Sequence, residues 1–401
     1  MTLRETKEEN IRKILAAPFG DMQGRVSYYP RYIQIEHSSF CNASCIMCNH
    51  FYLGNRGAAF LKPEIVELLN PIYPYVEMIM LNGDGEPFLH PLLRQFTRLY
   101  QEYGIITAAN TNLGIKGIDF NEYQGCFDSL SLSCDGAEKE TFERIREGIS
   151  FEQFCQNAAV LKSCLSDLRV TFDFVVMKEN LLELFKIVEL AAGLGINEIH
   201  FNLLGVNPEI GNESDAVSDC IHLAARELVK AQETGGRLGV KTFVPSVIPK
   251  TFDPEVAAAE EKILESTDFD ALIKERKARA AKQNREDLSD NHLHKETADS
   301  DYKYVAPDRK AWCSWGLERC YVDLQGNVTT CCFNVHHYMG NLLETGSFEK
   351  IWNGEAYRTF RRNMKNGVLP YWCENCTWRT ENGSKMEVGR TIPIKKRYKD
   401  R

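Results

Sequence analysis

The chain of 401 residues lacks any apolar run long enough to cross a membrane. Its first residues, Thr2 to Glu9, are mostly charged and contain none of the apolar core that marks a secretory signal. Positive charge is not in excess either, because the formal net charge is −8, which argues against a broad electrostatic contact with nucleic acid. These absences predict a cytoplasmic protein that has neither a membrane nor a nucleic acid as a partner.

Cysteine, in contrast, is abundant, with 14 residues in the chain. Because disulfides are rare in the reducing cytoplasm, a cysteine-rich chain without a secretory signal is better explained by thiolates that bind metal. The length suffices for one large domain and a smaller one. The spacing of the cysteines is therefore the first guide to function.

Strand-like and helix-like segments alternate from about residue 31 to residue 245. The strand-like segments are residues 32–36, 76–81, 105–109, 129–134, 170–176 and 198–201. Apolar residues at helical spacing lie between them, most clearly over residues 151–163 and 181–192. Such alternation predicts an α/β fold with a parallel sheet built from βαβ units.

Three cysteines, Cys41, Cys45 and Cys48, follow the first predicted strand with Cys-x3-Cys-x2-Cys spacing. Three thiolates at this spacing hold three irons of a [4Fe-4S] cluster and leave the fourth iron open to a small molecule. A zinc site is the alternative, since short cysteine motifs also bind zinc. The nearest fourth ligand, His50, follows too closely for a familiar zinc finger, so the spacing favours the cluster.

This motif after a first strand resembles that of the radical S-adenosylmethionine (SAM) superfamily. The resemblance implies a partial (β/α)6 TIM-like barrel and a cluster whose open iron binds SAM. It also implies that Met47, between the second and third cysteines, lies beside the adenine of SAM. Proteins of this kind cleave SAM reductively to a 5′-deoxyadenosyl radical that takes hydrogen from a substrate carbon. An electron donor such as flavodoxin or ferredoxin would supply the electron.

A glycine-rich turn, Gly83-Asp84-Gly85-Glu86, follows the second predicted strand. It resembles the superfamily turn that ends in Gly-Glu and binds the methionine amino group of SAM, although the family pattern is Gly-Gly-Glu. Glycine lets the backbone approach a ligand closely. Glu86 would add a charge-assisted hydrogen bond to the ammonium group.

Two residues further along the chain also match superfamily positions. Ser133, in a segment that resembles Ser-x-Asp-Gly, is expected to bind the ribose or the carboxylate of SAM. Arg146 matches a downstream arginine that pairs with the SAM carboxylate, and a guanidinium suits a carboxylate in a bidentate pair. An exposed helix arginine is the alternative interpretation of Arg146.

Several other polar residues have no clear assignment. Some follow predicted strand ends, where α/β proteins place ligand groups, but polar caps look the same; these are Thr111, Asn112 and Asn180. Three histidines have no recognisable partner and are expected to be structural; these are His37, His90 and His200.

The C-terminal part contains a second set of cysteines. Cys313 precedes a strand-like segment and the hairpin glycine Gly326, Cys331 follows that glycine, and Cys373-x2-Cys376 comes later. This succession resembles the SPASM and twitch extensions of radical SAM enzymes. The resemblance implies one auxiliary [4Fe-4S] cluster held by those four cysteines. No cysteine follows Cys376, so a second auxiliary cluster lacks ligands.

Alternatives remain for this second site. Cys320 or Cys332 could replace one of the four ligands. Four converging cysteines would also bind zinc, because ligand type alone does not separate zinc from an iron-sulfur cluster.

The domain boundaries follow from these motifs and from changes in composition. Residues 252 to about 305 are rich in Glu, Lys and Ala and predict an exposed helix followed by a polar linker. The predicted organisation is a lead-in helix (1–30), a radical SAM partial barrel (31–250), a charged helical insertion and linker (251–308), a SPASM- or twitch-like domain (309–385) and a basic tail (386–401).

The expected reaction is a two-electron oxidation, a dehydrogenation, of a small polar or carbohydrate-like metabolite, with the auxiliary cluster accepting an electron. Peptide maturation by a cross-link, a thioether or epimerisation is an alternative. The first thirty residues are too few for a leader-binding domain, which favours the small molecule. A redox-neutral epimerase would use a thiol as hydrogen donor, with Cys134, Cys320 and Cys332 as candidates. A non-catalytic iron-sulfur or zinc scaffold is the remaining alternative.

Overall fold

The computed structural model describes residues 1–48, 59–206, 212–286, 295–296, 304–305, 313–332, 337–370 and 373. Cys376, the basic tail and most of the predicted linker lie outside the described residues. Within the described part, no helix is both long and apolar enough to span a membrane.

The elements follow one another as the alternating pattern predicts. The strands of the main sheet are β1 (Tyr32–Ile35), β2 (Met78–Leu81), β3 (Ile106–Thr111), β4 (Ser129–Ser133), β5 (Arg169–Val176), β6 (Glu198–Leu203), β7 (Lys241–Phe243), β10 (Arg319–Val322), β11 (Asn327–Thr329) and β13 (Gly340–Asn341). Four two-residue strands form two small pairs, namely β8 (Lys295–Glu296) with β12 (His337–Tyr338) and β9 (Tyr304–Val305) with β14 (Val368–Leu369).

The α-helices are α1 (Leu3–Ala16), α3 (Pro63–Leu69), α4 (Leu93–Glu102), α5 (Lys139–Ile145), α6 (Phe151–Cys164), α7 (Leu184–Gly193), α8 (Ile221–Leu238), α9 (Pro254–Glu265), α10 (Phe269–Glu286), α11 (Leu342–Thr345), α12 (Phe348–Trp352) and α13 (Glu355–Lys365). Short 3-10 helices are η1 (Asn70–Tyr75), η2 (Pro87–Leu89), η3 (Phe120–Tyr123), η4 (Lys178–Glu183), η5 (Glu213–Asp215) and η6 (Val217–Asp219).

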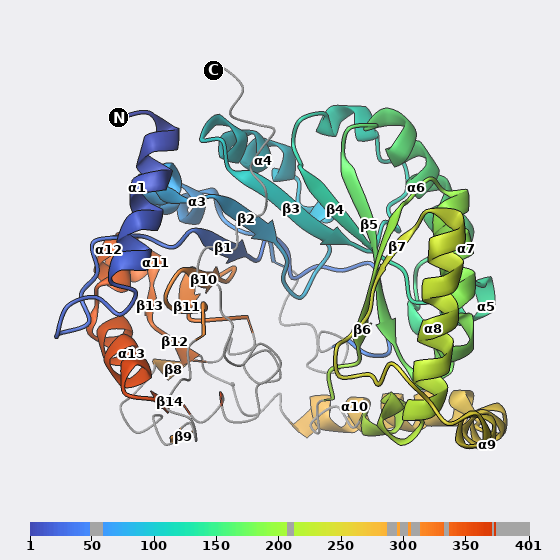
Figure 1. The fold of residues 1–401 in the computed structure, drawn as a ribbon. Helices are drawn as coiled ribbons and strands as arrows, with labels where there is room; N and C mark the ends of the chain where they lie inside the picture. The colour runs from blue at the N-terminus through green and yellow to red at the C-terminus, as the bar shows by residue number, and fades with distance from the viewer. Residues whose placement is uncertain are drawn as a thin grey trace.

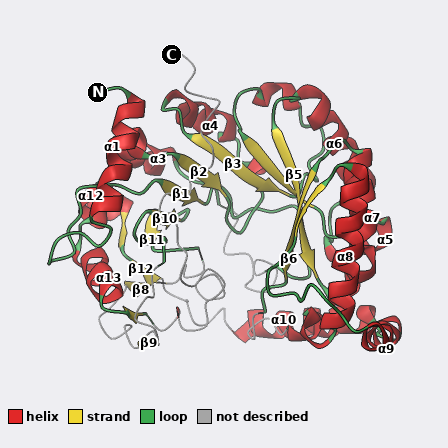
Figure 2. Cartoon of the chain, viewed as in Figure 1, coloured by secondary structure: helices red, strands yellow, loops and turns green. Residues whose placement is uncertain are grey.

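The six predicted strands form a parallel sheet in the order of the sequence, from β1 to β6, and β7 continues it in parallel. Figure 1 shows the curved sheet with helices α4 to α8 along its outer side, and Figure 2 shows the same arrangement by secondary structure. The outward-facing residues of β4, such as Leu130 and Leu132, are buried against these helices, whereas Ser131 and Ser133 face the inner side and are partly exposed. The predicted α/β fold with a partial (β/α)6 barrel is confirmed.

The C-terminal module joins the barrel through a shared sheet. Strand β10 pairs in parallel with β1, with Tyr32 opposite Arg319 and Ile35 opposite Val322. Strands β11 and β13 then extend the sheet antiparallel. The described part of the chain therefore contains one continuous sheet that runs from β13 to β7.

A buried ion cluster lies next to this junction. The Arg31 guanidinium donates to the Glu77 carboxylate at 2.7 Å and to the Glu318 carboxylate at 3.2 Å. All three side chains are almost fully buried. Glu77 directly precedes β2, and Glu318 directly precedes β10. Arg31 therefore ties the start of β1 to the starts of its two neighbouring strands.

We expect Arg31→Met to lower the free energy of unfolding by about 3–5 kcal/mol, because the substitution leaves two carboxylates buried without their cation. Denaturant unfolding of the purified protein measures this. Arg237→Met, which removes an exposed arginine of α8, is the control and should change stability by less than about 1 kcal/mol. Equal stability of the two variants would contradict the structural role of Arg31.

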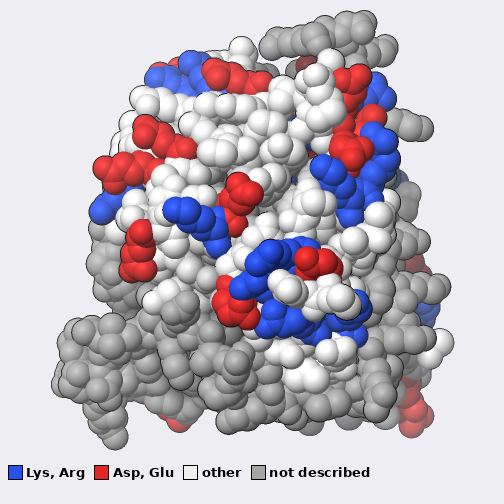
Figure 3. Space-filling view, turned by 90° about the vertical axis from the view of Figure 1, so that its left-hand side faces the viewer, with Lys and Arg blue, Asp and Glu red and all other residues white. Residues whose placement is uncertain are grey.

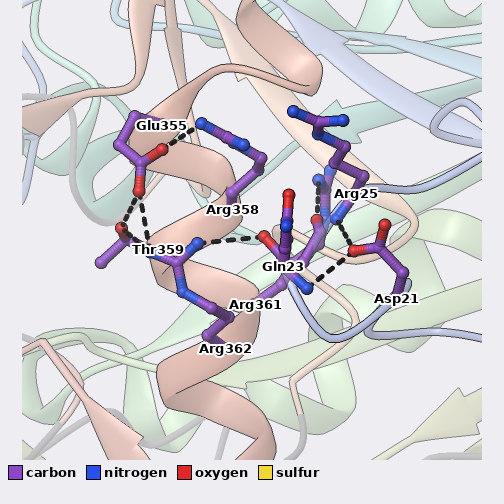
Figure 4. Close-up of polar contacts among 9 residues, drawn as sticks. Asp21, Gln23, Arg25, Glu355, Arg358, Thr359, Arg361 and Arg362 are labelled. Carbon is purple, nitrogen blue, oxygen red and sulfur yellow. Dashed lines mark hydrogen bonds and ion pairs between the residues drawn. The ribbon is translucent and has the colours of Figure 1, made fainter.

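The N-terminal lead-in packs against the C-terminal module. Arg361 of α13 is fully buried, lies 4.4 Å above the Trp352 ring and donates to the carbonyl oxygens of Trp352 and Gly24. Arg362 donates to the carbonyl oxygen of Gln23 at 3.0 Å, as Figure 4 shows. The loop around residue 24 is thereby fixed on α13.

Candidate active site

One cavity of about 320 Å³ lies where strands β1 to β4 end at their carboxyl termini. The predicted residues that line it are Cys41, Cys45, Cys48, Gly83, Asp84, Gly85, Glu86, Ser133 and Arg146. Residues for which the sequence indicates no definite role also line it, namely Ala43, Asn82, Asn110, Thr111 and Asn112. Met47 packs against the hydrophobic core and does not line the cavity. Motifs that are far apart in the sequence thus surround a single space.

The loop that carries the cysteines, residues 38–48, is attached to the glycine-rich turn, and we call it the cysteine loop. The Glu86 backbone N–H donates to the Phe40 carbonyl at 2.9 Å. A Cβ on Gly85 would lie 2.4 Å from the Ser38 carbonyl oxygen and 2.6 Å from that of Phe40. Only glycine therefore permits this close approach of two backbone segments.

Other parts of the barrel also hold the cysteine loop. The Ser44 and Ile46 N–H groups donate to the carbonyls of Glu147 and Ile145, at 2.7 and 3.0 Å, at the C-terminal end of α5. The Asn42 side chain donates to the Gly114 carbonyl at 2.8 Å. The loop has no helix or strand of its own over Cys41 to Cys48, so these contacts fix where the three thiols lie.

Glu86 connects the glycine-rich turn to the end of β3. Its buried carboxylate accepts hydrogen bonds from the Thr111 hydroxyl at 2.8 Å and from the Asn112 N–H at 2.7 Å. Burial raises the pKa of Glu86 to about 7, and these hydrogen bonds oppose that rise. The predicted bond to the SAM ammonium would be made by a carboxylate that is already held in place.

Two side chains direct N–H groups at the cysteine sulfurs. Asn112 Nδ2 lies 3.6 Å from Cys41 Sγ, and Arg146 Nη1 lies 3.7 Å from Cys45 Sγ. Hydrogen bonds to sulfur stabilise thiolate charge and are one way in which a protein tunes an iron-sulfur cluster. The only sequence signal for this role is the position of Asn112 just after a strand.

Arg146 has a further partner that the sequence analysis did not assign. Its guanidinium lies 2.5 Å from the carboxylate of Asp135, which is fully buried and also accepts from the Val175 N–H at 2.7 Å. Burial raises the pKa of Asp135, and Arg146 counteracts that rise. Any bond from Arg146 to the SAM carboxylate would be additional to this ion pair.

The donor set fits an iron-sulfur cluster. Three thiols, the ligand type that iron-sulfur clusters use, line one cavity. A cluster needs one thiolate for each of three separate irons, whereas structural zinc needs its ligands around one point. Burial raises the pKa of Cys41 to about 11, so metal binding would displace a proton from the thiol.

The helical insertion contributes to this site. Arg276 of α10 is only 3% exposed, donates to the Ile46 carbonyl at 3.1 Å and forms an ion pair with Asp215. Ile273, one turn earlier, packs in the same small hydrophobic cluster as Ile46. Figure 1 shows α10 beyond the C-terminal end of β6. The helix predicted to be exposed therefore buries one face against the cysteine loop.

We expect Arg276→Met to weaken binding of the cluster at the cysteine loop and to lower the free energy of unfolding by about 3–5 kcal/mol, since Asp215 stays buried without its cation. Adding Asp215→Asn should restore part of the stability but not the bond to Ile46. Iron content and chemical denaturation measure the two effects. The control is Lys277→Met, on the same helix as Arg276, which removes an exposed ion pair with Glu147 of the barrel. It should change neither the iron content nor the stability. Full iron in the Arg276 variant would contradict the positioning role.

The C-terminal cysteines lie in a second region of the molecule. Cys313, Cys331, Cys332 and Cys373 are partly exposed, whereas Cys320 on β10 is fully buried in the hydrophobic core. None of the described cysteines forms a disulfide with another. The fourth predicted ligand, Cys376, lies outside the described residues.

The candidate hydrogen donors Cys134 and Cys320 are core residues. The Cys134 thiol donates to the Gly136 carbonyl at 3.4 Å, and burial raises the pKa of both thiols far above the usual value. Neither residue, nor Cys332, lines the described cavity.

Two of the histidines have structural partners, as expected. His37 contacts the Ile35 carbonyl at 2.9 Å and the Tyr100 hydroxyl at 3.2 Å, and His90 contacts the Leu61 carbonyl at 3.1 Å. Asn180 is fully buried and bonds to backbone groups around the end of β5. His200 differs, because it lies on the inner side of the barrel and is partly exposed.

Comparisons with known proteins extend this picture. The probable GTP 3′,8-cyclase of Saccharolobus islandicus (strain L.S.2.15 / Lassen #1) is 26% identical over 175 residues, which cover 42% of this chain and 55% of that protein. The chain thus spans about half the length of the curated relatives it matches. The structure of Streptococcus suis SuiB bound to S-adenosylmethionine has a similar fold, with a TM-score of 0.56 and 13% identity over 89% of this chain and 73% of that one. A structure of anSMEcpe with bound AdoMet gives a TM-score of 0.53 and 16% identity over 85% and 82% of the two chains.

The family model of the SPASM iron-sulfur cluster-binding domain matches residues 313–377, where the second set of cysteines lies. The chain therefore carries a C-terminal SPASM domain, and its fold is similar to that of structures solved with S-adenosylmethionine. The domain is an iron-sulfur cluster-binding one, which agrees with the auxiliary cluster predicted for these cysteines.

Proposed function

We propose that this protein is a radical SAM enzyme that removes a hydrogen atom from a polar small molecule and oxidises it by two electrons, and that the auxiliary cluster accepts the second electron. The observation that carries this proposal is the position of the cavity. The three cysteines and the glycine-rich turn line it, and it opens beside polar side chains on the inner side of the barrel.

The roles of the residues follow from their places. Cys41, Cys45 and Cys48 would each ligate one iron of the SAM-binding cluster, and the glycine-rich turn, Ser133 and Arg146 would surround SAM. Cys313, Cys331, Cys373 and Cys376 would ligate the auxiliary cluster. When bound, the cluster and SAM supply the 5′-deoxyadenosyl radical that takes hydrogen from the substrate.

The substrate would bind to a polar group on the inner side of β3, β5 and β6. Asn110, which lines the cavity, donates from its side chain to the Asp173 carboxylate at 3.3 Å. The other carboxylate oxygen of Asp173 lies 4.0 Å from His200 Nδ1. Ser133, also at the cavity, is the register neighbour of Asp173 in the sheet. Asp173 is thus one strand away from the space assigned to SAM.

Asp173 and His200 suit a substrate with hydroxyl or amino groups. Their side chains are 21% and 37% exposed, so a ligand on the inner side of the barrel can reach them. Burial raises the pKa of Asp173, which favours a carboxylate that takes a proton when an alcohol or amine carbon is oxidised. Asp173 and His200 are therefore our candidates for binding the substrate and accepting its proton.

Peptide modification is a second candidate function. It is favoured by two proteins of similar fold, because SuiB has been crystallised with the precursor peptide SuiA, and anSMEcpe with AdoMet and the Cp18Cys peptide. A partly exposed inner surface that carries a carboxylate and an imidazole would also bind a peptide side chain.

The test uses anaerobically reconstituted protein, SAM and dithionite. We expect formation of 5′-deoxyadenosine. The protein is then incubated with small-molecule and peptide fractions of an extract from cells grown on deuterated medium. Deuterium in 5′-deoxyadenosine from the small-molecule fraction would support the oxidation of a metabolite. Deuterium from the peptide fraction alone would favour the second function, and no SAM cleavage despite a reduced cluster would reject both.

A further inference from the structure

A basic surface lies on α13 and the adjoining N-terminal loop, and none of its residues lines the described cavity. We call it the α13 patch and define it by Arg25, Arg358, Arg362 and Lys365. Figure 3 shows Lys and Arg side chains gathered in one compact region low on this face, with Asp and Glu at its edges. Arg358, Arg362 and Lys365 share one side of the helix because they are spaced by three or four residues.

Positive charge exceeds negative charge in this patch. Two carboxylates, Asp21 and Glu355, lie beside the four cations, and Glu355 pairs with both Arg358 and Arg362, as Figure 4 shows. Arg361, although fully buried, contacts aromatic rings and carbonyl oxygens, and within the described part of the chain no carboxylate forms an ion pair with it. The excess is notable because the whole chain carries a net charge of −8.

The inner face of the same helix packs against the rest of the SPASM domain next to its cysteines. The Tyr357 hydroxyl donates to the Thr329 carbonyl at 3.1 Å, two residues before Cys331. The Phe360 ring packs on Gly316, which lies three residues after Cys313. A Cβ added to Gly316 would lie 2.4 Å from this ring. The chain also continues from α13 to Cys373. One helix, about 10–12 Å across with its side chains, therefore separates the patch from the cysteine segments.

We propose that the α13 patch docks an acidic one-electron carrier protein, which exchanges electrons with the auxiliary cluster across α13. The proposal rests on the two-electron oxidation proposed above. Charge complementarity argues for this partner, because opposite charges steer a transient redox encounter and raise its association rate. Such encounters need only a small interface, so one helix face is sufficient.

The redox balance leaves one electron that such a partner can take. In the proposed oxidation the substrate loses one hydrogen atom to the radical, then one electron to the auxiliary cluster and one proton to a base. The cluster is then reduced by one electron and must lose it before the next turnover. An oxidised carrier on the patch takes that electron and is reduced by one, and no atom is transferred. The reverse reaction, from a reduced carrier to the cluster, uses the same contact.

The experiment measures the reverse reaction in the full-length Cys41→Ala/Cys45→Ala/Cys48→Ala variant, which keeps the auxiliary cluster alone. A purified acidic flavodoxin in its hydroquinone form is mixed with it under anaerobic stopped-flow conditions. We expect a second-order rate constant that falls as ionic strength rises. In this background, Arg25→Glu/Arg362→Glu/Lys365→Glu should lower the rate constant by about tenfold or more and remove most of its salt dependence.

The matched control is Lys186→Glu/Lys230→Glu/Arg237→Glu, which reverses three exposed cations of α7 and α8 and changes the net charge equally. Its rate constant should stay within about twofold of the parent. Equal rates for the patch and control variants would overturn the proposal, as would absence of cluster reduction by flavodoxin in the parent. Arg25→Glu and Lys365→Glu as single, exposed substitutions repeat the test if the triple variant misfolds. Dithionite-driven SAM cleavage by the wild type reports separately on the proposed function.

Discussion

Replacing Cys41, Cys45 and Cys48 with alanine should abolish the formation of 5′-deoxyadenosine and remove about half of the bound iron. The expected content falls from about eight irons to about four for each chain, because each [4Fe-4S] cluster holds four. The EPR signal of the reduced wild type should change when SAM is added, and the variant should lose this response. Iron analysis and EPR of anaerobically reconstituted protein measure both effects.

Cys155→Ala/Cys164→Ala is the matched control, since it removes two partly exposed thiols of α6 that belong to neither motif. It should keep all the iron and the activity. About four irons in the wild type and none in the variant, with zinc retained, would instead make the C-terminal module a zinc domain. That result would remove the electron acceptor from the proposed reaction and favour redox-neutral chemistry.

Gly85→Ala should reduce cluster binding or SAM cleavage by about 10–100-fold, the usual cost of disturbing the residues that support metal ligands. The added Cβ would lie 2.4 Å from the Ser38 carbonyl oxygen, so the cysteine loop or the glycine-rich turn must move. We expect the iron of the SPASM domain to remain, because Gly85 lies in the barrel, where the added Cβ would meet the cysteine loop. Iron content and the rate of 5′-deoxyadenosine formation measure the loss.

Gly193→Ala is the control for this substitution. It lies at the end of α7, has nothing within 4 Å of the added Cβ and should leave iron and activity unchanged. Wild-type activity and iron content in Gly85→Ala would show that the two loops can separate without consequence. In that case their close contact would have no part in placing the cysteines.

Much of the candidate site could be predicted because its residues stand in short, contiguous motifs. The cysteine motif and the turn from Gly83 to Glu86 each follow a strand, and parallel strands bring their carboxyl ends to one edge of the sheet. The structure places both motifs around one cavity. The order of strands and motifs was therefore sufficient to predict that they meet.

For other residues of the site, local sequence did not indicate the role that the structure shows. Arg276 reaches the Ile46 carbonyl across 230 residues of sequence, and its surroundings of Lys, Glu and Ala indicate only an exposed helix. Asn112 contacts Cys41 through one side-chain bond, and Asp135 reaches Cys45 only through Arg146. A polar cap would have the same sequence pattern as either residue. Their roles depend on tertiary contacts that composition and periodicity do not encode.

The pairing of β10 with β1 has a consequence for the order of events during synthesis. Strand β1 is made early, but β10, which pairs with one of its edges, is complete only at Val322. This edge of β1 therefore stays unpaired while the residues between the two strands are translated. Unpaired strand edges favour aggregation, and long-range parallel pairing is slow. Nascent chains that stall before β10 should therefore be especially insoluble.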